Sequence, residues 1–242
     1  MVFEVLQERR IFEGKIITLT PLHIGSGAPE FKGEAIPILK SVDGRPYIPG
    51  SSLKGKVRSE LEKLAKKLAL IEQGKCKPPD PEEMCGAKAR SEEDLCIACR
   101  IFGAIAGKKG GYSRASKVIF RDAYSKEEIK TIERPGIAID RETGTVHERA
   151  LYTIELVPSG KSFDLEIVTE NLTSQELGLF LAALKSVEDL GLGGSISRGL
   201  GKVKIQLDRM IVRTAEYYVG RADQQILEGD KLAKWVEEKT KL

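Results

Sequence analysis

Hydrophobic and polar residues alternate along several segments of the chain, as they do in half-buried β-strands. The strands predicted in this way cover residues 11–24, 117–124, 151–156, 162–170 and 202–207. Two further segments, residues 35–48 and 134–148, predict β-hairpins. Each has β-branched residues on both sides of a turn sequence, Asp43-Gly44 in the first and Glu142-Thr143-Gly144 in the second.

Two segments change to helical periodicity. In residues 52–71 the apolar positions follow every third or fourth residue, at Leu53, Val57, Leu61, Leu64, Ala65 and Leu68. A second helix begins at the capping box formed by Thr173 and Glu176, and it ends at Gly191. The strands and helices together predict an α+β fold with a β-α-β-β-α-β core of the ferredoxin-like type.

We expect a single domain over residues 1–242, with the core at about 11–208. Insertions are predicted at about residues 25–48, 72–100 and 130–148, and a helical C-terminal tail is predicted at 221–242.

Composition limits the classes of function. A hydrophobic content of 41% over 242 residues is enough for a packed core, and the net charge of +3 is too weak to mark a nucleic-acid-binding protein by itself. The first residues carry charges and no apolar run approaches about 18 residues, so we expect a soluble, cytoplasmic protein without membrane contact. Charged residues make up 31% and Asn171 is the only asparagine, a balance that favours a thermophilic source.

The start of the first predicted helix combines groups that bind phosphate. Pro49-Gly50 ends an extended segment, and Ser51 and Ser52 stand where a helix takes its N-cap. Lys54, Lys56 and Arg58 follow in the first two turns. Free backbone N–H groups, hydroxyls and cations at a helix start suit an anion. The alternative is an ordinary serine cap on a solvated face.

Four cysteines lie within a segment that has almost no core residues. Cys76 and Cys85 precede a C-x-x-C pair, Cys96 and Cys99, and three prolines stand between the first two. Such a segment cannot fold on hydrophobic burial alone. A structural Cys₄ zinc site would hold it together. Reduced thiols and disulfides are the alternatives, the latter occurring inside cells chiefly in hyperthermophiles.

Two glycine-rich turns are further candidates for a binding role. One carries His23, which either has a structural role or donates to a phosphate. The other, residues 191–201, contains five glycines and Arg198 and leads into a strand. It is not a P-loop, because no helix and no Gly-Lys-Ser/Thr sequence follow. So many glycines let a backbone approach another group closely, and a plain flexible turn is the alternative.

Four of these landmarks occur together in one order. They are Leu22-His23-Ile24-Gly25, the segment 48–55 (IPGSSLKG), Cys96-x-x-Cys99-Arg100-Ile101-Phe102-Gly103, and the glycine-rich segment 191–201. In this combination the chain resembles the RAMP superfamily of CRISPR-associated proteins. The likeness is greatest to the small backbone subunit that repeats along the guide RNA in type III effector complexes.

The resemblance implies a modified ferredoxin-like, RRM-like fold with a hairpin thumb pushed between segments of guide RNA. It implies a role in antiviral defence, with guide RNA, target RNA, further copies of the chain and other type III subunits as the partners. It also implies that the cysteine segment corresponds to a region that zinc holds together in some members of the family. The residues it assigns to RNA are His23, Ser51, Ser52, Lys54, Lys56, Arg58, Gly193, Gly194, Arg198, Gly199 and, in the thumb, Arg134, Arg141 and Arg149. Contacts of this kind position RNA without reading its sequence.

One departure concerns cleavage. Family members that cut target RNA carry an aspartate two residues before a proline in the first hairpin, and here Ala35 stands at that position before Pro37. The neighbouring Glu34, the remaining catalytic candidate, would point to the opposite face of an extended strand. We therefore expect little or no cleavage.

Three other functions are compatible with the sequence. The chain could be a target-cleaving endoribonuclease that uses Glu34 with Mg²⁺ or Mn²⁺, or a repeat-processing nuclease that uses His23 or His147. From outside RNA biology, a zinc-stapled interaction module is the third alternative.

Overall fold

The computed structural model describes residues 5–26, 35–71, 76–77, 80, 82–137, 139–146 and 152–241. A five-stranded sheet forms its centre, in the order β3 (Val118–Phe120), β7 (Ser162–Glu170), β1 (Glu8–Thr18), β8 (Val203–Thr214) and β9 (Gln225–Glu228). Every neighbouring pair is antiparallel. The first four of these strands have the order of a ferredoxin-like core, so the predicted α+β fold class is confirmed.

Only one face of the sheet carries the core. Phe12 and Ile16 on β1 are buried and stand opposite Ile167 and Phe163 on β7, whereas Glu13, Lys15, Asp164 and Glu166 occupy alternate positions of the two strands. A bulge between Glu13 and Gly14 shifts the register with β8. A Cβ atom at Gly14 would lie 1.9 Å from the carbonyl oxygen of Gln206, so only glycine fits at that point.

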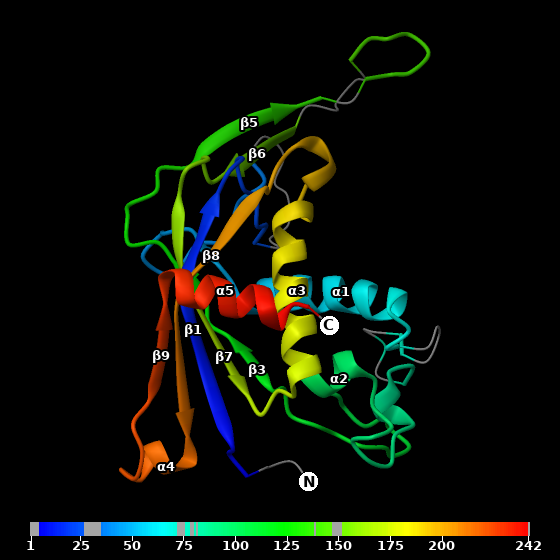
Figure 1. Cartoon of the computed structure of the whole chain (residues 1–242). Helices are drawn as coiled ribbons and strands as arrows, with labels where there is room; N and C mark the ends of the chain where they lie inside the picture. The colour runs from blue at the N-terminus through cyan, green and yellow to red at the C-terminus, as the bar shows by residue number, and fades with distance from the viewer. Residues whose placement is uncertain are drawn as a thin grey trace.

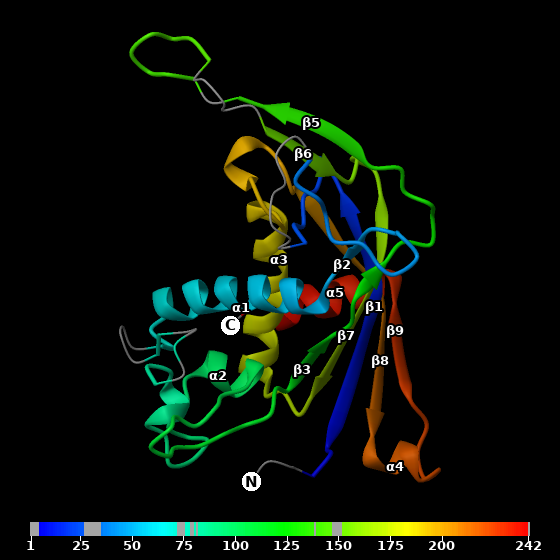
Figure 2. The same cartoon turned by 180° about the vertical axis from the view of Figure 1, so that it is seen from behind.

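Three helices lie on the core side of the sheet (Figures 1 and 2): α1 (Gly50–Lys67), α3 (Ser174–Leu190) and α5 (Gly229–Lys239). The predicted apolar stripe of α1 is buried at Leu53, Val57 and Leu61. Each fully buried side chain of this size contributes about 1.5–3 kcal/mol. α5 covers the sheet through Trp235, whose ring centroid lies 6.4 Å from that of Phe12. None of the described helices is both long and apolar enough to cross a bilayer.

The capping box of α3 is confirmed. The Thr173 hydroxyl accepts a hydrogen bond from the backbone N–H of Glu176 at 3.2 Å, and the Glu176 carboxylate accepts one from the backbone N–H of Thr173 at 3.0 Å. The helix ends at Gly191, which has a φ of 85°.

The predicted serine cap of α1 is wrong. The helix begins two residues earlier, at Gly50, its N-cap is Pro49, and no side chain within the segment caps it. Instead, Asp122 accepts a hydrogen bond of 2.8 Å from the backbone N–H of Gly50. A Cβ atom at Gly50 would lie 2.2 Å from the carbonyl oxygen of Phe120, so glycine lets the turn after β3 reach the helix start. The capping group comes from 72 residues away, and local sequence could not identify it.

The remaining elements form two small ribbons and several short helices. β2 (Tyr47–Ile48) pairs with β4 (Ala123–Tyr124), and β5 (Ile132–Gly136) pairs with β6 (Tyr152–Leu156). The short helices are α2 (Ile97–Phe102), α4 (Ala215–Tyr218) and the 3₁₀ turns Cys85–Ala87 and Ile196–Arg198. The β5–β6 ribbon extends away from the sheet (Figure 1) and corresponds to the predicted thumb, although it includes β6 and begins before residue 134.

Several boundaries differ from the predictions. β1 ends at Thr18 instead of residue 24, and the segment 35–48 forms a turn with a single bridge, Lys40 to Pro46, before β2. The tail predicted as helical from residue 221 first forms strand β9 and becomes helical at Gly229. β8 is twice as long as predicted, and its far half offers a free edge on which β9 pairs, so sheet pairing overrides local preference there.

Candidate functional site

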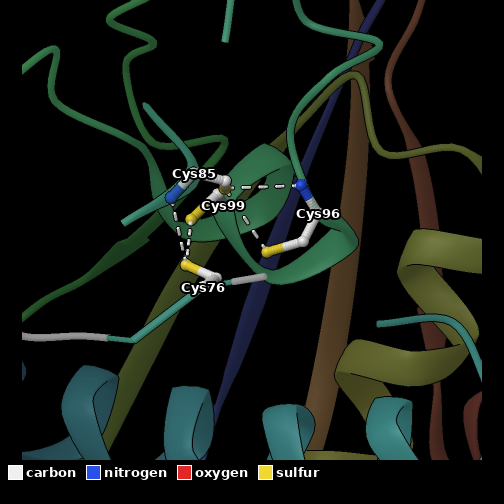
Figure 3. A group of neighbouring side chains, drawn as sticks. All are labelled: Cys76, Cys85, Cys96 and Cys99. Carbon is white, nitrogen blue, oxygen red and sulfur yellow. Dashed lines mark hydrogen bonds between the residues drawn. The ribbon is translucent and has the colours of Figure 1, made fainter. Parts of the chain in front are cut away.

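The four cysteines converge on one point (Figure 3). Cys76 comes from the segment after α1, Cys85 from a 3₁₀ turn, Cys96 from the N-cap of α2 and Cys99 from its first turn. All four are buried and reduced, and their sulfur atoms lie within 4.8 Å of one another. The predicted clustering of the cysteines is therefore confirmed.

The geometry of this cysteine cluster fits a tetrahedral metal site. The Sγ atoms of Cys76 and Cys99 are 3.6 Å apart, and those of Cys85 and Cys96 are 3.7 Å apart. Four sulfurs at about 2.3 Å from a central ion would be about 3.8 Å from one another. A disulfide needs about 2.05 Å, so these pairs are not bonded. The residues present thus match a Cys₄ ligand set.

Backbone and side-chain donors point at the sulfurs. The N–H of Cys85 donates to the Sγ of Cys76 at 3.4 Å, and the N–H of Cys96 donates to the Sγ of Cys85 at 3.5 Å. The guanidinium of Arg58, on α1, donates to the Sγ of Cys99 at 3.3 Å. Hydrogen bonds between the thiols, that of Cys76 first, lower the pKa of Cys85 strongly and raise the pKa of Cys99. The backbone N–H groups and the guanidinium are placed to stabilise thiolate, which is the form that binds metals.

The cations predicted at the start of α1 all have partners. Lys54 donates to the hydroxyl of Ser116 at 2.9 Å, and Lys56 pairs with the buried Glu60 at 3.4 Å. Arg58 pairs with Glu62 at 2.9 Å in addition to its contact with Cys99. Ser51 is exposed and Ser52 is half-buried. Lys56 and Arg58 each pair with a carboxylate, whereas the partner of Lys54 is a hydroxyl.

His23 lies against the glycine-rich loop on the other side of the fold. Its Nδ1 atom is 2.8 Å from the carbonyl oxygen of Glu155, and because a carbonyl only accepts, Nδ1 carries the proton. The backbone N–H of Gly194 donates to the His23 carbonyl at 2.8 Å. A Cβ atom at Gly193 would lie 2.2 Å from that same oxygen, so this glycine is required by contact within the chain.

The loop also brings Arg198 to the base of the thumb. Its guanidinium donates to the Tyr152 hydroxyl at 2.5 Å and lies over the Tyr152 ring, 5.9 Å from the centroid. Gly199 follows with a φ of 85° and open space around its Cα. On the thumb itself Arg134 and Arg141 are exposed. The candidates Glu34, His147 and Arg149 lie outside the described residues.

The predicted residues therefore form two groups. One joins α1 to the cysteine cluster through Arg58, and the other joins His23, the glycine-rich loop and the thumb base. Sequence reasoning missed two acidic residues that position these groups: Asp122, which caps α1, and Glu155, which stands beneath His23. Neither carries a local motif, because their partners are distant in the sequence.

Glu155 fixes the first hairpin to the thumb base. Its carboxylate accepts hydrogen bonds from the backbone N–H of Ile38, from Lys40 and from the hydroxyl of Thr131, at 3.2, 2.5 and 2.6 Å. Burial alone would raise the pKa of Glu155, but the hydrogen bonds from Lys40 and Thr131 outweigh it and hold the pKa below its ordinary value.

A lowered pKa in the folded state means that Glu155 stabilises the fold above its unfolded pKa of about 4.3, and that this contribution is lost as the pH falls. We expect Glu155→Gln to lower the free energy of unfolding by about 1–3 kcal/mol at pH 7 and by clearly less at pH 3. Urea unfolding at the two pH values measures this. Glu127→Gln, at a solvent-exposed ion pair with Lys161, is the matched control and should change little at either pH. Equal losses for Glu155→Gln at both pH values would contradict the assignment.

The open face of the sheet has a different character. Glu13 pairs with Arg209 at 2.5 Å, Arg121 with Glu166 at 3.3 Å, and Lys126 with Asp164 at 3.3 Å. The aromatic residues of β1 and β7, Phe12 and Phe163, are buried on the helix-covered side. RRM domains bind RNA by stacking bases on sheet aromatics, and these strands offer none on the open face.

Comparison with known proteins agrees with this arrangement. The family model of the RAMP superfamily matches residues 15–204. The chain is 33% identical to the CRISPR system Cms endoribonuclease Csm3 of Methanocaldococcus jannaschii, over 91% of this chain and 88% of that protein. It is 31% identical to the Csm3 of Methanothermobacter thermautotrophicus, over 91% and 93% of the two chains.

A solved structure shares the fold over nearly the whole length. It is a crystal structure of a Csm3–Csm4 subcomplex in the type III-A CRISPR-Cas interference complex, and it matches with a TM-score of 0.60 and 27% identity over 99% of this chain and 98% of the solved chain. The family match, the relatives and the shared fold lead to one conclusion: the chain belongs to the RAMP superfamily.

Proposed function

We propose that the chain is the guide-RNA-binding backbone subunit of a type III CRISPR interference complex. The observation that carries the proposal is the match to relatives named Csm3, which extends over about nine-tenths of both chains, thumb and cysteine segment included. Several copies would repeat along one guide RNA, present it to target RNA for pairing, and contact other subunits of the complex.

The thumb supports an assembling role. The β5–β6 ribbon projects from the body (Figure 2), and its described residues expose apolar side chains at Ile132, Ile137, Ile139 and Val146. Exposed β-branched residues on a projecting ribbon are costly in a monomer and are typical of a surface that another molecule covers. We propose that the next copy of the chain and its RNA bury these side chains.

The charge distribution supports contact with the RNA backbone. Lys54, at the start of α1, and Arg198, beside the thumb base, both have neutral hydrogen-bond partners and are able to take a phosphate. Arg134 and Arg141 extend this set along the exposed thumb. Phosphate contacts position RNA without specifying sequence, as a subunit that accepts any guide requires.

We propose zinc as the ion of the cysteine cluster. Four thiolates in a closed tetrahedral set select zinc among the common ions of structural sites. When bound, the ion would hold the separate parts of the segment 76–99 together. Arg58 would join this segment to α1 through its contact with Cys99. No catalytic role is proposed for it, since a closed set leaves no position for a substrate.

RNA binding by the isolated chain tests the proposal. We expect single-stranded RNA of any sequence to bind, with log K falling against log salt at a slope near −3 if about four phosphates are neutralised. Lys54→Ala should flatten the slope by about 0.7, the contribution of one phosphate contact on a single strand. Fluorescence anisotropy across a salt series measures both.

Lys67→Ala is the matched control, because it removes the same charge from the last turn of the same helix. Its slope should equal that of the unsubstituted chain. If the two variants behave alike, the start of α1 does not contact RNA. If the unsubstituted chain binds no RNA, the proposed function itself fails.

A further inference from the structure

A hollow in the surface leads to the cysteine cluster at a single residue. Its volume is about 440 Å³, and its lining consists of Cys85, Lys88, Ala89, Arg90 and Asp94. Cys76 and Cys96 are buried and do not line this hollow, and Cys99 is fully buried and accepts a hydrogen bond from Arg58. A small reagent that enters the hollow therefore meets Cys85, which closes it on the side of the cluster.

The sulfurs of the cluster form two pairs (Figure 3). The Sγ atom of Cys85 lies 3.7 Å from that of Cys96, and the Sγ atom of Cys76 lies 3.6 Å from that of Cys99. A disulfide between Cys85 and Cys96 requires the first pair to close by about 1.7 Å. Cys85 stands in a 3₁₀ turn and Cys96 is the N-cap of α2, so neither is held in the interior of a long helix.

We propose that Cys85 is a site of reversible oxidation by hydroperoxides, with Cys96 as the resolving thiol. With hydrogen peroxide, the Cys85 thiolate attacks one oxygen, an S–O bond forms, the O–O bond breaks, and hydroxide leaves with the electron pair. The Cys96 thiolate then attacks the sulfur of this sulfenic acid. An S–S bond forms, the S–O bond breaks, and a second hydroxide leaves. The two sulfurs lose two electrons, and the peroxide gains them.

The charges of the hollow suit the first of these steps. Lys88 and Arg90 line it together with one carboxylate, that of Asp94. The two cations place positive charge near the oxygen that departs as hydroxide, and fixed charge of this sign stabilises a leaving anion. The hollow therefore offers both access to Cys85 and support for the product of the oxidation.

The oxidation would undo the cluster in two stages. The first disulfide removes two thiolates from the Cys₄ set, so that the set no longer holds an ion tetrahedrally. Cys76 and Cys99 remain as the second pair, and a second peroxide molecule converts them in the same way. That stage also removes the thiolate to which Arg58 donates, and with it a contact between the segment 76–99 and α1. None of these steps depends on RNA binding.

Disulfide mapping of the whole chain tests the assignment. One equivalent of hydrogen peroxide should lower the free thiols from the four of the reduced chain to about two and release bound zinc. Digestion with trypsin and endoproteinase Glu-C separates Cys76 from Cys85, and fragmentation of the peptides distinguishes Cys96 from Cys99. The first disulfide should join Cys85 to Cys96, and dithiothreitol should restore all four thiols.

A first disulfide between Cys96 and Cys99, or thiols that dithiothreitol does not restore, would overturn the proposal. Thiol counting needs no metal. A chain purified without zinc that still forms the disulfide between Cys85 and Cys96 would therefore contradict the zinc assignment and support this one.

Two matched variants test the order of the steps. Cys96→Ser removes the resolving thiol, so the sulfenic acid of Cys85 should persist and react with dimedone. Cys76→Ser also removes one sulfur, but from the other pair, and should form the disulfide between Cys85 and Cys96 without a dimedone label. Equal labelling of Cys85 in the two variants excludes Cys96 as its partner. The mapping of the unsubstituted chain decides the case if either variant fails to fold.

Discussion

Cys99→Ser is expected to release about one equivalent of zinc per chain and to unfold the segment around the cysteine cluster. Structural zinc contributes on the order of 10 kcal/mol of binding free energy in small metal-dependent domains. Here the cluster supplies much of the buried core of the segment 76–99, in which Leu95 and Ala98 are among the few other buried apolar residues. The sheet and α3 do not depend on it, and we expect them to remain folded.

Two measurements check this. Metal analysis of the chain purified without added zinc should give about one equivalent, and close to none for Cys99→Ser. Limited trypsin digestion should cut the variant at Lys88 and Arg90, which lie within the segment. Ala89→Ser is the matched control, because it also places a hydroxyl at a buried position of the same segment but removes no sulfur. A metal-free chain with a protease-resistant segment would exclude the zinc site.

Complexes assembled from this chain are expected to bind complementary target RNA and to cut it slowly or not at all. A general base or a metal ligand must reach the reacting atoms, so a carboxylate at the wrong position cannot support cleavage whatever its chemistry. Ala35 offers no functional group at the position where target-cleaving family members carry aspartate. The backbone there is in place: the N–H of Ile36 donates to the carbonyl of Thr153 at 2.7 Å, beside the base of the thumb.

Ala35→Asp should therefore create cleavage if the remaining parts of the site are present. The assay uses a guide-loaded assembly, labelled target RNA, and Mg²⁺ or Mn²⁺, and the expected products are regularly spaced. Ala35→Asn, which has the same shape without the negative charge, should stay inactive. Regular products from the unsubstituted chain that disappear with Glu34→Ala would reverse the conclusion and make the chain an endoribonuclease.

Local sequence predicted what depends on nearby residues. The capping box of α3 needs only Thr173 and Glu176, and the stripe of α1 follows from helical spacing, so both were predictable. The cysteine cluster was predictable because an otherwise coreless segment contains every cysteine of the chain. In each case the interacting residues are close in sequence or share one rare chemical property.

Long-range partners escaped prediction. Asp122 caps α1 from a distant turn, and Glu155 collects donors from Ile38, Lys40 and Thr131. The sequence alone does not show why a glycine is present. Gly193 leaves room for the His23 carbonyl, whereas Gly55 faces open space. Only the fold shows which glycine is required by internal packing and which faces open space.

Strand β9 has a consequence for how the molecule associates. It pairs with β8 over Arg209–Val212, where the backbone N–H and C=O groups would otherwise be a template for a strand of another molecule. Loss of the segment after residue 221 would expose that template together with the apolar surface that α5 covers, including Phe12. In a protein whose proposed role is ordered repetition along RNA, we expect the short edge strand β9 to limit pairing between sheets, so that the thumb and the RNA set the spacing between neighbours.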